Sequence, residues 1–318
     1  MNKKFGIIGN ERMTLRCLRY MLEQPGIEVG FVIYDPGKEN GGLADFCSKH
    51  AVPCYGTSRL HTPENLEMIR AYQPDMILSI SNYWVMKKEL LDIPENGVLN
   101  FHNGPPSNYR GIYVPSWVIL NGETRHGVMW HFAEENVDSG DVIGSRMFDV
   151  AEDETAATLM VKCISQGIEL FRELFGKIVS ASYSRFPQTG DALHYTKKHR
   201  PENEGILDFT WSKTKLRRMA RALNYLPFPN PFCYARLKTT AGEVIVNELY
   251  EAAGMAGELP CGQVVKAMAD EFLVACSDGV IGIAAAMDAS WNEYEPGDLP
   301  GILGVKEGDI LKPILSQA

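Results

Sequence analysis

Three polar side chains whose types could act together lie between residues 97 and 143. Asn100 and His102 stand one residue apart at the end of a short apolar segment, and Asp138 lies in a Val-Asp-Ser-Gly-Asp stretch. Residues i and i+2 of an extended chain project to the same face, so this spacing predicts that the amide and the imidazole project together. An amide donor, a base that titrates near neutrality and a carboxylate to orient that base are suited to proton transfer and to oxyanion stabilisation.

The elements that must position these residues have the pattern of an α/β fold. Segments of strand length alternate with segments of helical apolar spacing, over residues 5–8, 11–22, 27–34, 63–72, 76–80 and 98–101. Such alternation predicts a mostly parallel, twisted sheet that is covered on both faces. Ligand sites in these sheets lie at the carboxyl ends of the strands. Asn82 and His102 both follow predicted strands and are expected at that edge.

The second half of the chain changes character. A long amphipathic helix is predicted over 155–179, and a polar, proline-containing linker follows over 186–205. After a further helix, short strand-like segments separated by turn residues suit a small β-barrel. The predicted organisation is therefore an α/β domain over 1–185, the linker over 186–205, and a hinge helix plus barrel over 206–318.

Composition excludes several classes of function. The net charge is −9, and the part from Ile206 onward has ten Lys/Arg against fourteen Asp/Glu, which argues against nucleic-acid binding. No run of 18 apolar residues is present, so we expect no membrane span. Seven cysteines without a Cys-x-x-Cys spacing indicate reduced thiols in the cytoplasm and no metal centre. The segment after the first strand lacks the third glycine of a dinucleotide-binding fingerprint.

An ordered set of motifs resembles the folate-dependent formyltransferase family. That family includes methionyl-tRNA formyltransferase, glycinamide ribonucleotide transformylase, amino-sugar N-formyltransferases and the formylation domains of some peptide synthetases. The interval of 36 residues between His102 and Asp138 also fits the family. The motifs are Asn100-Phe101-His102, Tyr109-Arg110-Gly111, Asn121-Gly122-Glu123, His126-Gly127-Val128 and Val137-Asp138-Ser139-Gly140-Asp141-Val142-Ile143.

The resemblance implies a Rossmann-like formyltransferase domain followed by an OB-like β-barrel domain. It implies 10-formyltetrahydrofolate as the formyl donor and places the catalytic roles on Asn100, His102 and Asp138. Asn100 would donate a hydrogen bond to the oxyanion, and Asp138 would orient the imidazole. His102 would either accept the amine proton or, when protonated, support the oxyanion, and the sequence leaves both roles open.

The resemblance also assigns binding residues. The donor ring would lie along the backbone after the strand 76–80 and against the loop before Asp138, which gives Tyr83, Trp84, Val85, Met86, Glu134, Glu135 and Val137. Acceptor contacts are expected from Asn10, Arg12, Asn103 and Arg110. Where many relatives have Ser-Leu-Leu-Pro after the histidine, this chain has Asn-Gly-Pro-Pro at residues 103–106, which leaves the acceptor open.

We expect the acceptor to be a primary amine of a nucleotide-linked or otherwise activated amino sugar, and a homodimer is compatible with the resemblance. The alternatives are an aminoacyl group on a carrier protein, methionyl-tRNA, and hydrolysis of 10-formyltetrahydrofolate with water in place of the amine.

Each site residue also has a plainer interpretation. Asn100 and Asp138 are residue types that form turns, and His102 could be a satisfied structural histidine. His126 and His131, on or beside a predicted strand, are expected to be structural.

Overall fold

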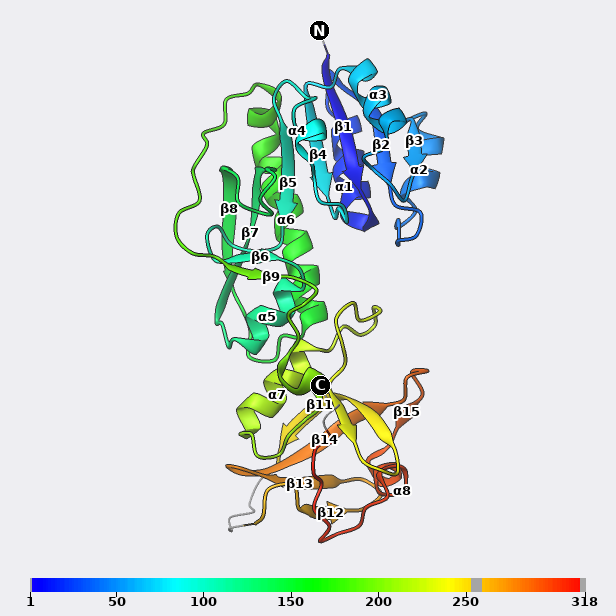
Figure 1. Cartoon of the computed structure of the whole chain (residues 1–318), viewed down its shortest axis with the longest axis vertical. Helices are drawn as coiled ribbons and strands as arrows, with labels where there is room; N and C mark the ends of the chain where they lie inside the picture. The colour runs from blue at the N-terminus through cyan, green and yellow to red at the C-terminus, as the bar shows by residue number, and fades with distance from the viewer. Residues whose placement is uncertain (1, 253–258, 315–318) are drawn as a thin grey trace. The chain divides into compact units, whose positions relative to one another are not determined.

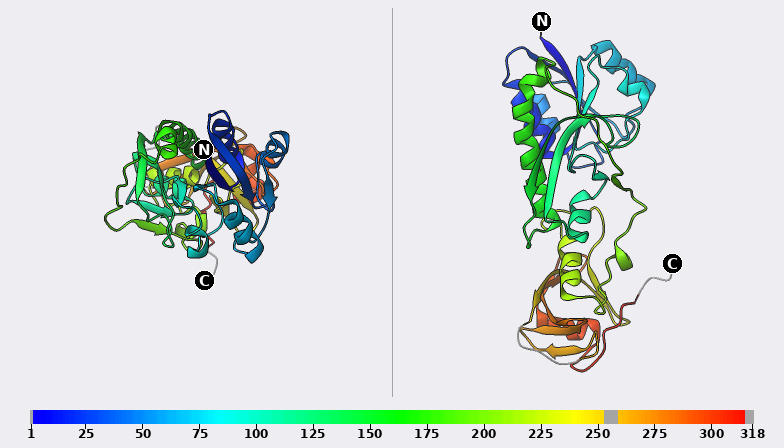
Figure 2. Two further views of the ribbon diagram at one scale, coloured as in Figure 1. Left: turned by 90° about the horizontal axis from the view of Figure 1, so that it is seen from above. Right: turned by 90° about the vertical axis from the view of Figure 1, so that its left-hand side faces the viewer.

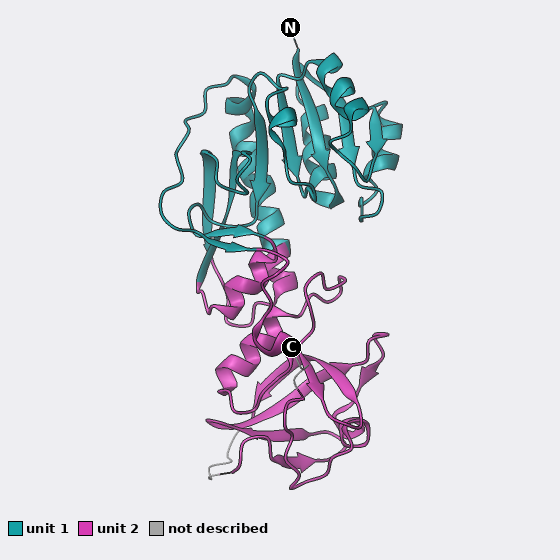
Figure 3. Ribbon diagram, in the orientation of Figure 1, with its two compact units in different colours: residues 1–111, 125–148, 161–195 teal, residues 112–124, 149–160, 196–318 magenta. Residues whose placement is uncertain are grey.

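The computed structural model describes residues 2–252 and 259–314. Contacts divide the chain into unit 1, residues 1–111, 125–148 and 161–195, and unit 2, residues 112–124, 149–160 and 196–318 (Figure 3). This division differs from the continuous boundaries expected from the sequence. The predicted linker 186–205 is shared between the two units, and residues 112–124 leave the α/β part of the chain to pack with the C-terminal half.

Within the described residues, unit 1 contains a sheet of seven strands in the order β3-β2-β1-β4-β5-β7-β8 (Figure 1). The first five of these in the order pair in parallel, and β7 runs antiparallel to β5. The sheet is therefore mostly parallel, as predicted. The strands are β1 (Lys3–Gly9), β2 (Ile27–Tyr34), β3 (Cys54–Gly56), β4 (Met76–Ile80), β5 (Val98–His102), β7 (Arg125–Phe132) and β8 (Val142–Asp149).

Helices cover both faces of this sheet (Figure 2). On one face lie α1 (Glu11–Leu22) and α6 (Ala156–Val179). The ring centroid of Phe175 on α6 is 5.6 Å from that of Tyr20 on α1 and 6.0 Å from that of Phe5 on β1. The short helix α2 (Leu43–Lys49) packs beside α1.

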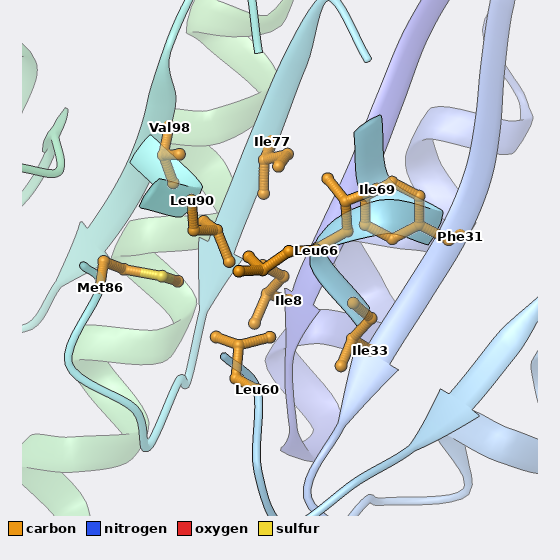
Figure 4. Packing of buried hydrophobic residues seen from close by; sticks show 10 residues of the cluster. All are labelled: Ile8, Phe31, Ile33, Leu60, Leu66, Ile69, Ile77, Met86, Leu90 and Val98. Carbon is orange, nitrogen blue, oxygen red and sulfur yellow. The ribbon is translucent and has the colours of Figure 1, made fainter. Parts of the chain in front are cut away.

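The other face is covered by α3 (Pro63–Tyr72) and α4 (Lys88–Leu91). Their apolar side chains form one cluster with those of the strands: Ile8, Phe31, Ile33, Leu60, Leu66, Ile69, Ile77, Met86, Leu90 and Val98 (Figure 4). Thr62 caps α3, because its hydroxyl accepts a hydrogen bond from the backbone N–H of Asn65.

Two short strands, β6 (Tyr109–Gly111) and β9 (Leu193–Tyr195), pair in parallel outside the main sheet. This pair joins the loop after β5 to the segment that the sequence suggested was a linker. The loop that follows His102 is therefore fixed to a distant part of the chain.

Unit 2 contains an antiparallel sheet of order β10-β11-β14-β13-β12, with β15 pairing to β14, in its described residues. The helix α5 (Val114–Leu120) packs on α7 (Lys213–Ala222), and the Ser116 hydroxyl lies 2.8 Å from that of Tyr225. A mostly parallel α/β sheet followed by a curled antiparallel sheet confirms the predicted fold class. The remaining elements are β10 (Arg236–Lys238), β11 (Glu243–Glu251), β12 (Val264–Ala267), β13 (Phe272–Cys276), β14 (Gly279–Met287), β15 (Glu293–Tyr294) and α8 (Leu299–Leu303).

Candidate active site

Strand β5 carries the first two site residues to the carboxyl edge of the parallel strands. Asn100 lies in register with Ser79 of β4 on one side and with His131 of β7 on the other. His102 is the last residue of β5 and pairs with Met129. The strand thus places the amide among polar neighbours and the imidazole where the chain leaves the sheet.

The orientation of the Asn100 amide is fixed by its neighbours. The Ser79 hydroxyl donates to Asn100 Oδ1 at 2.7 Å, and Asn100 Nδ2 lies 3.1 Å from His131 Nε2. Asn100 Nδ2 is also 3.5 Å from Asp138 Oδ1. At this longer distance the amide hydrogen is weakly bound, so it remains available to an incoming acceptor.

His131 is a member of the site that the sequence did not identify. Its Nδ1 lies 2.8 Å from the carbonyl oxygen of Phe132, which can only accept a hydrogen bond, so Nδ1 carries a proton. Its Nε2 faces both Asn100 Nδ2, at 3.1 Å, and Asp138 Oδ1, at 3.5 Å. Its place opposite Asn100 in the β5–β7 register is the signal that could have revealed it.

Both ring nitrogens of the buried His102 face acceptors. Nδ1 lies 3.3 Å from Asp138 Oδ2, and Nε2 lies 2.8 Å from the carbonyl oxygen of Tyr109. Only an imidazolium can donate to both at once. Burial lowers the pKa of His102, Asp138 acts to raise it, and nearby His131 and Arg110 add to the lowering.

Asp138 completes the cluster from a turn in which its backbone is left-handed, with φ of 51°. Its Oδ2 accepts the backbone N–H of Gly111 at 2.9 Å. Burial acts to raise the pKa of Asp138, but the His102 and His131 imidazoles and the Gly111 N–H outweigh it and hold that pKa well below its usual range. The carboxylate is therefore ionised at neutral pH.

The two acceptor residues expected in the loop after β5 lie beside this cluster. Arg110 is half-buried, and its buried Nε has no hydrogen-bond partner among the described residues. The charge of Arg110 reaches the imidazole, since it contributes to the lowered pKa of His102. Asn103 is held through its backbone, because His126 Nε2 lies 3.0 Å from its carbonyl oxygen.

The first expected wall for the donor follows β4. The Asn82 side chain closes this turn, since it accepts the Trp84 N–H at 2.9 Å and donates to the Trp84 carbonyl at 2.7 Å. Met86 is buried in the apolar cluster of Figure 4, and Trp84 packs against the same cluster. Tyr83 and Val85 are exposed, at 49% and 64% of their surface.

The second expected wall is the loop before Asp138. Ala133, which precedes Glu134, packs on the same apolar cluster as Trp84. Glu134 and Glu135 line an open surface depression together with Gly97 and Arg185, and Val137 is half-buried. Carboxylates beside an apolar surface suit a flat heterocycle that carries N–H donors.

Asn10, an expected acceptor contact, lies in the turn between β1 and α1. Its side chain is fully buried, donates to the Asp35 carbonyl at 2.9 Å and accepts the Asp35 N–H at 3.1 Å. These bonds tie the end of β1 to the loop after β2. Arg12 lies at the start of α1 and is exposed.

Two features are absent from the described ranges, 2–252 and 259–314. No group of three or more His, Cys, Asp or Glu side chains is arranged to hold a metal ion. None of the described helices combines the length and apolarity needed to cross a membrane.

Comparison with known families gives two matches along the chain. The Formyl transferase model matches residues 35–174, and the model named Formyl transferase, C-terminal domain, matches residues 201–295. The chain is also similar to methionyl-tRNA formyltransferase of Geobacter sulfurreducens, with 25% identity over 86% of both chains.

Two solved structures resemble the chain in fold. The N-formyltransferase from Helicobacter canadensis, in complex with folinic acid and dTDP-3-aminofucose, has a TM-score of 0.67 at 17% identity and covers 92% of this chain and 100% of its own. HypX from Aquifex aeolicus, in complex with tetrahydrofolic acid, has a TM-score of 0.65 at 19% identity and covers 98% of this chain and 49% of its own.

The two family models lie in chain order, together span most of the residues, and include the strand, the loops and the turn that bring Asn100, His102 and Asp138 into contact. The chain belongs to the formyltransferase family and is an N-formyltransferase.

Proposed function

We propose that the enzyme transfers the formyl group of 10-formyltetrahydrofolate to a primary amine of a nucleotide-linked amino sugar. The observation that carries the reaction is the contact of the Asp138 carboxylate with both His102, at 3.3 Å, and Asn100, at 3.5 Å. One carboxylate thereby orients the proton-transfer group and the amide donor around the same point.

The proposed oxyanion donor is the amide of Asn100. Attack of the amine on the formyl carbon turns the carbonyl oxygen into an oxyanion, to which Asn100 Nδ2 donates. A single well-placed donor of this kind contributes about 3 kcal/mol to the stability of the transition state. Ser79 and His131 hold the amide in that orientation before the reaction begins.

The proton of the amine must leave as the new C–N bond forms, and the N10 leaving group must gain one. His102 Nε2 performs both transfers once the Tyr109 carbonyl, now 2.8 Å away, is displaced. Asp138 remains ionised because its pKa is depressed, so it keeps the imidazole oriented throughout.

The donor is proposed to lie between the backbone of residues 83–86 and the loop 134–137. Trp84 and Ala133 pack on one apolar cluster, which fixes the two walls to the same face of the sheet. Glu134 and Glu135 supply acceptors for ring N–H groups, as expected from the resemblance.

The amino-sugar acceptor is favoured by the charge of unit 2. Three of the five Lys and Arg side chains of α7 are paired with carboxylates: Lys213 and Arg217 lie 2.9 and 3.2 Å from the Glu251 carboxylate, and Lys215 lies 2.6 Å from that of Glu202. A domain that holds tRNA needs unpaired cations to displace phosphate counterions. The fold of the Helicobacter enzyme with its dTDP-linked sugar also supports this acceptor.

Methionyl-tRNA is the second candidate acceptor. The support for it is the similarity to methionyl-tRNA formyltransferases over most of both chains, including one from Geotalea uraniireducens at 26% identity over 96% of each. The two acceptors differ in size and charge, so a direct assay separates them.

The test measures release of tetrahydrofolate from 10-formyltetrahydrofolate by the full chain. A dTDP-linked 3-amino sugar, an aminoacyl pantetheine and methionyl initiator tRNA are supplied in turn, with one reaction that lacks any amine. Release that requires the amino sugar supports the proposal. Release with only one of the other amines reassigns the acceptor, and equal release without an amine indicates a hydrolase.

Two substitutions test the chemistry in the same assay. His102→Ala and Asn100→Ala should each lower turnover by at least about a hundredfold. Ser139→Ala is the control, because its hydroxyl donates to the Asn136 carbonyl at 2.9 Å within the exposed part of the same turn. Near-normal turnover in either site variant would contradict the assignment.

A further inference from the structure

The segment of residues 186–195, which we call the strap, lies between the stretches 35–174 and 201–295 matched by the two family models. It belongs to unit 1 and contacts two loops of the site. Phe186 exchanges two backbone hydrogen bonds with Val142, at 2.8 and 2.9 Å. Further along, β9 pairs with β6, and the Leu193 N–H donates to the Asn108 carbonyl at 2.7 Å.

One side chain of the strap, that of Gln188, joins both loops. Its Oε1 accepts the backbone N–H of Ser107 at 3.0 Å. Its Nε2 donates to the carbonyl of Asp138 at 3.0 Å and to that of Gly140 at 2.8 Å. The side-chain oxygen of Gln188 thus binds the loop after His102, and its side-chain NH2 group binds the turn that contains Asp138.

We propose that Gln188 is a positioning residue for the transfer reaction: it holds the Asp138 turn and the loop after His102 in the relative geometry that aims the Asp138 carboxylate at the imidazole. This inference rests on the proposed function. The hydrogen bonds of Gln188 go to main-chain atoms, so it acts on the carboxylate through the backbone of Asp138.

The turn needs such support because its backbone is unfavourable. The backbone of Asp138 is left-handed, with φ of 51°, a conformation that is unfavourable for a non-glycine residue. Gln188 binds the carbonyls of Asp138 and Gly140, the residues on either side of Ser139, and so fixes the backbone of this turn. The carboxylate is then held between the Gly111 N–H, at 2.9 Å, and His102 Nδ1, at 3.3 Å.

Only a primary amide of this length provides one acceptor and two donors at the observed distances. An ionised Glu at position 188 would keep the bond from Ser107 but place negative charge against two carbonyl oxygens. Leu would keep the volume and lose all three bonds. These two substitutions therefore separate packing from hydrogen bonding.

The test uses Gln188→Leu, Gln188→Glu and Gln188→Asn in the full chain. The control is Gln24→Leu, which removes a side chain that donates to the Tyr20 carbonyl at 3.2 Å on α1. Turnover is measured with whichever of the three amine acceptors the wild-type enzyme formylates. The pKa of His102 is measured separately by NMR of the labelled imidazole, without donor or acceptor.

Gln188→Leu and Gln188→Glu should lower kcat by roughly ten- to a hundredfold, because a displacement of a catalytic group by about 1 Å can slow a reaction by up to about a hundredfold. KM for the donor should stay within about threefold of the wild-type value. The pKa of His102 should fall below its wild-type value, since Asp138 raises it. Gln188→Asn should recover part of both effects, and Gln24→Leu should show neither.

A kcat within about twofold of wild type in Gln188→Leu, or an unchanged His102 pKa in that folded variant, would overturn the inference. Failure of the wild-type enzyme to consume the donor with any amine would instead defeat the proposed function. The NMR titration would still decide the role of Gln188 in that case.

Discussion

His102 Nε2 lies 2.8 Å from the carbonyl oxygen of Tyr109, seven residues later in the chain. The same ring faces Asp138 Oδ2 through Nδ1 at 3.3 Å. Since a neutral imidazole has a single N–H, loss of the ring proton leaves one of these acceptors facing a lone pair. Deprotonation of His102 therefore weakens its contact with Tyr109 at the same time as it creates the base that the reaction needs.

The first prediction concerns the titration of His102. Because burial lowers its pKa, the ring should titrate below the ordinary value of about 6.5 and be neutral above about pH 7. Asp138→Asn should lower this pKa further, since Asp138 raises it in the wild type, and should reduce kcat at least about a hundredfold. NMR of labelled histidine, with the His102→Gln spectrum for assignment, measures the shift. A higher pKa in Asp138→Asn would be inconsistent with this account.

The second prediction concerns Gly104. A Cβ at this position would lie 2.5 Å from His102 Nε2 and 2.8 Å from the Tyr109 carbonyl oxygen. Neither neighbour is the free end of a flexible side chain, so Gly104→Ala must push them apart. We expect kcat to fall at least about tenfold while the chain remains folded.

Gly176→Ala is the matched control for Gly104→Ala. Position 176 lies within α6, and an added Cβ would meet no atom within 4 Å. This variant should keep wild-type turnover and gain roughly 0.5–1 kcal/mol of stability from helix propensity. Equal kcat in the two alanine variants would contradict the prediction.

The third prediction concerns His126 and folding stability. Burial lowers the pKa of His126 to about 4, and its bond to the Asn103 carbonyl only partly offsets this effect. In the unfolded chain His126 takes up a proton at about pH 6.5, whereas in the folded chain it stays neutral until about pH 4. The free energy of unfolding is therefore unaffected by His126 above about pH 6.5, and it decreases as the pH falls from there towards about 4. The loss attributable to His126 is of the order of 3 kcal/mol.

Urea unfolding at about pH 7.5 and about pH 4.5 measures this contribution. His126→Gln retains an N–H donor for Asn103 but cannot titrate, so its free energy of unfolding should fall less between the two pH values. Groups other than His126 contribute to both proteins alike. Equal losses in the two proteins would show that His126 is not the source.

The fourth prediction concerns the paired cations of α7. Glu251→Ala frees Lys213 and leaves Arg217 only its longer contact with Glu152, at 3.7 Å, and should therefore tighten binding of initiator tRNA at low salt. The slope of log affinity against log salt should steepen by up to about two, close to one for each additional phosphate that a freed cation neutralises. Glu248→Ala removes an exposed carboxylate from the same strand and serves as the control. Unchanged tRNA affinity in Glu251→Ala would argue against this neutralisation.

Much of the fold follows from local patterns in the sequence. The bounds of α1, β2, α3 and β4 agree with the predicted ones. Each of these elements shows regular apolar spacing along its length and has residues at its ends that stop or cap it. The strands β6 and β9 could not be predicted in this way. They have three residues each, and their pairing depends on a contact between distant parts of the chain.

The site was predictable to the extent that it depends on spacing along one strand. Asn100 and His102 share a strand, and the family order supplied Asp138. The roles of His131 and Gln188 depend on which side chains face each other across the folded chain. The hydrogen bonds between the Asn10 side chain and the Asp35 backbone likewise depend on how the end of β1 meets the loop after β2.

The packing of α5 against α7 has a consequence for how this enzyme can be dissected. Trp117 of α5 contacts Phe232, and their ring centroids are 5.3 Å apart. A fragment cut after residue 185 would retain α5 but lose both α7 and Phe232, and would leave apolar surface bare to solvent. Expression of the α/β half alone should therefore yield an aggregating polypeptide, and exchange of C-terminal halves between related enzymes should succeed only when α5 is exchanged with them.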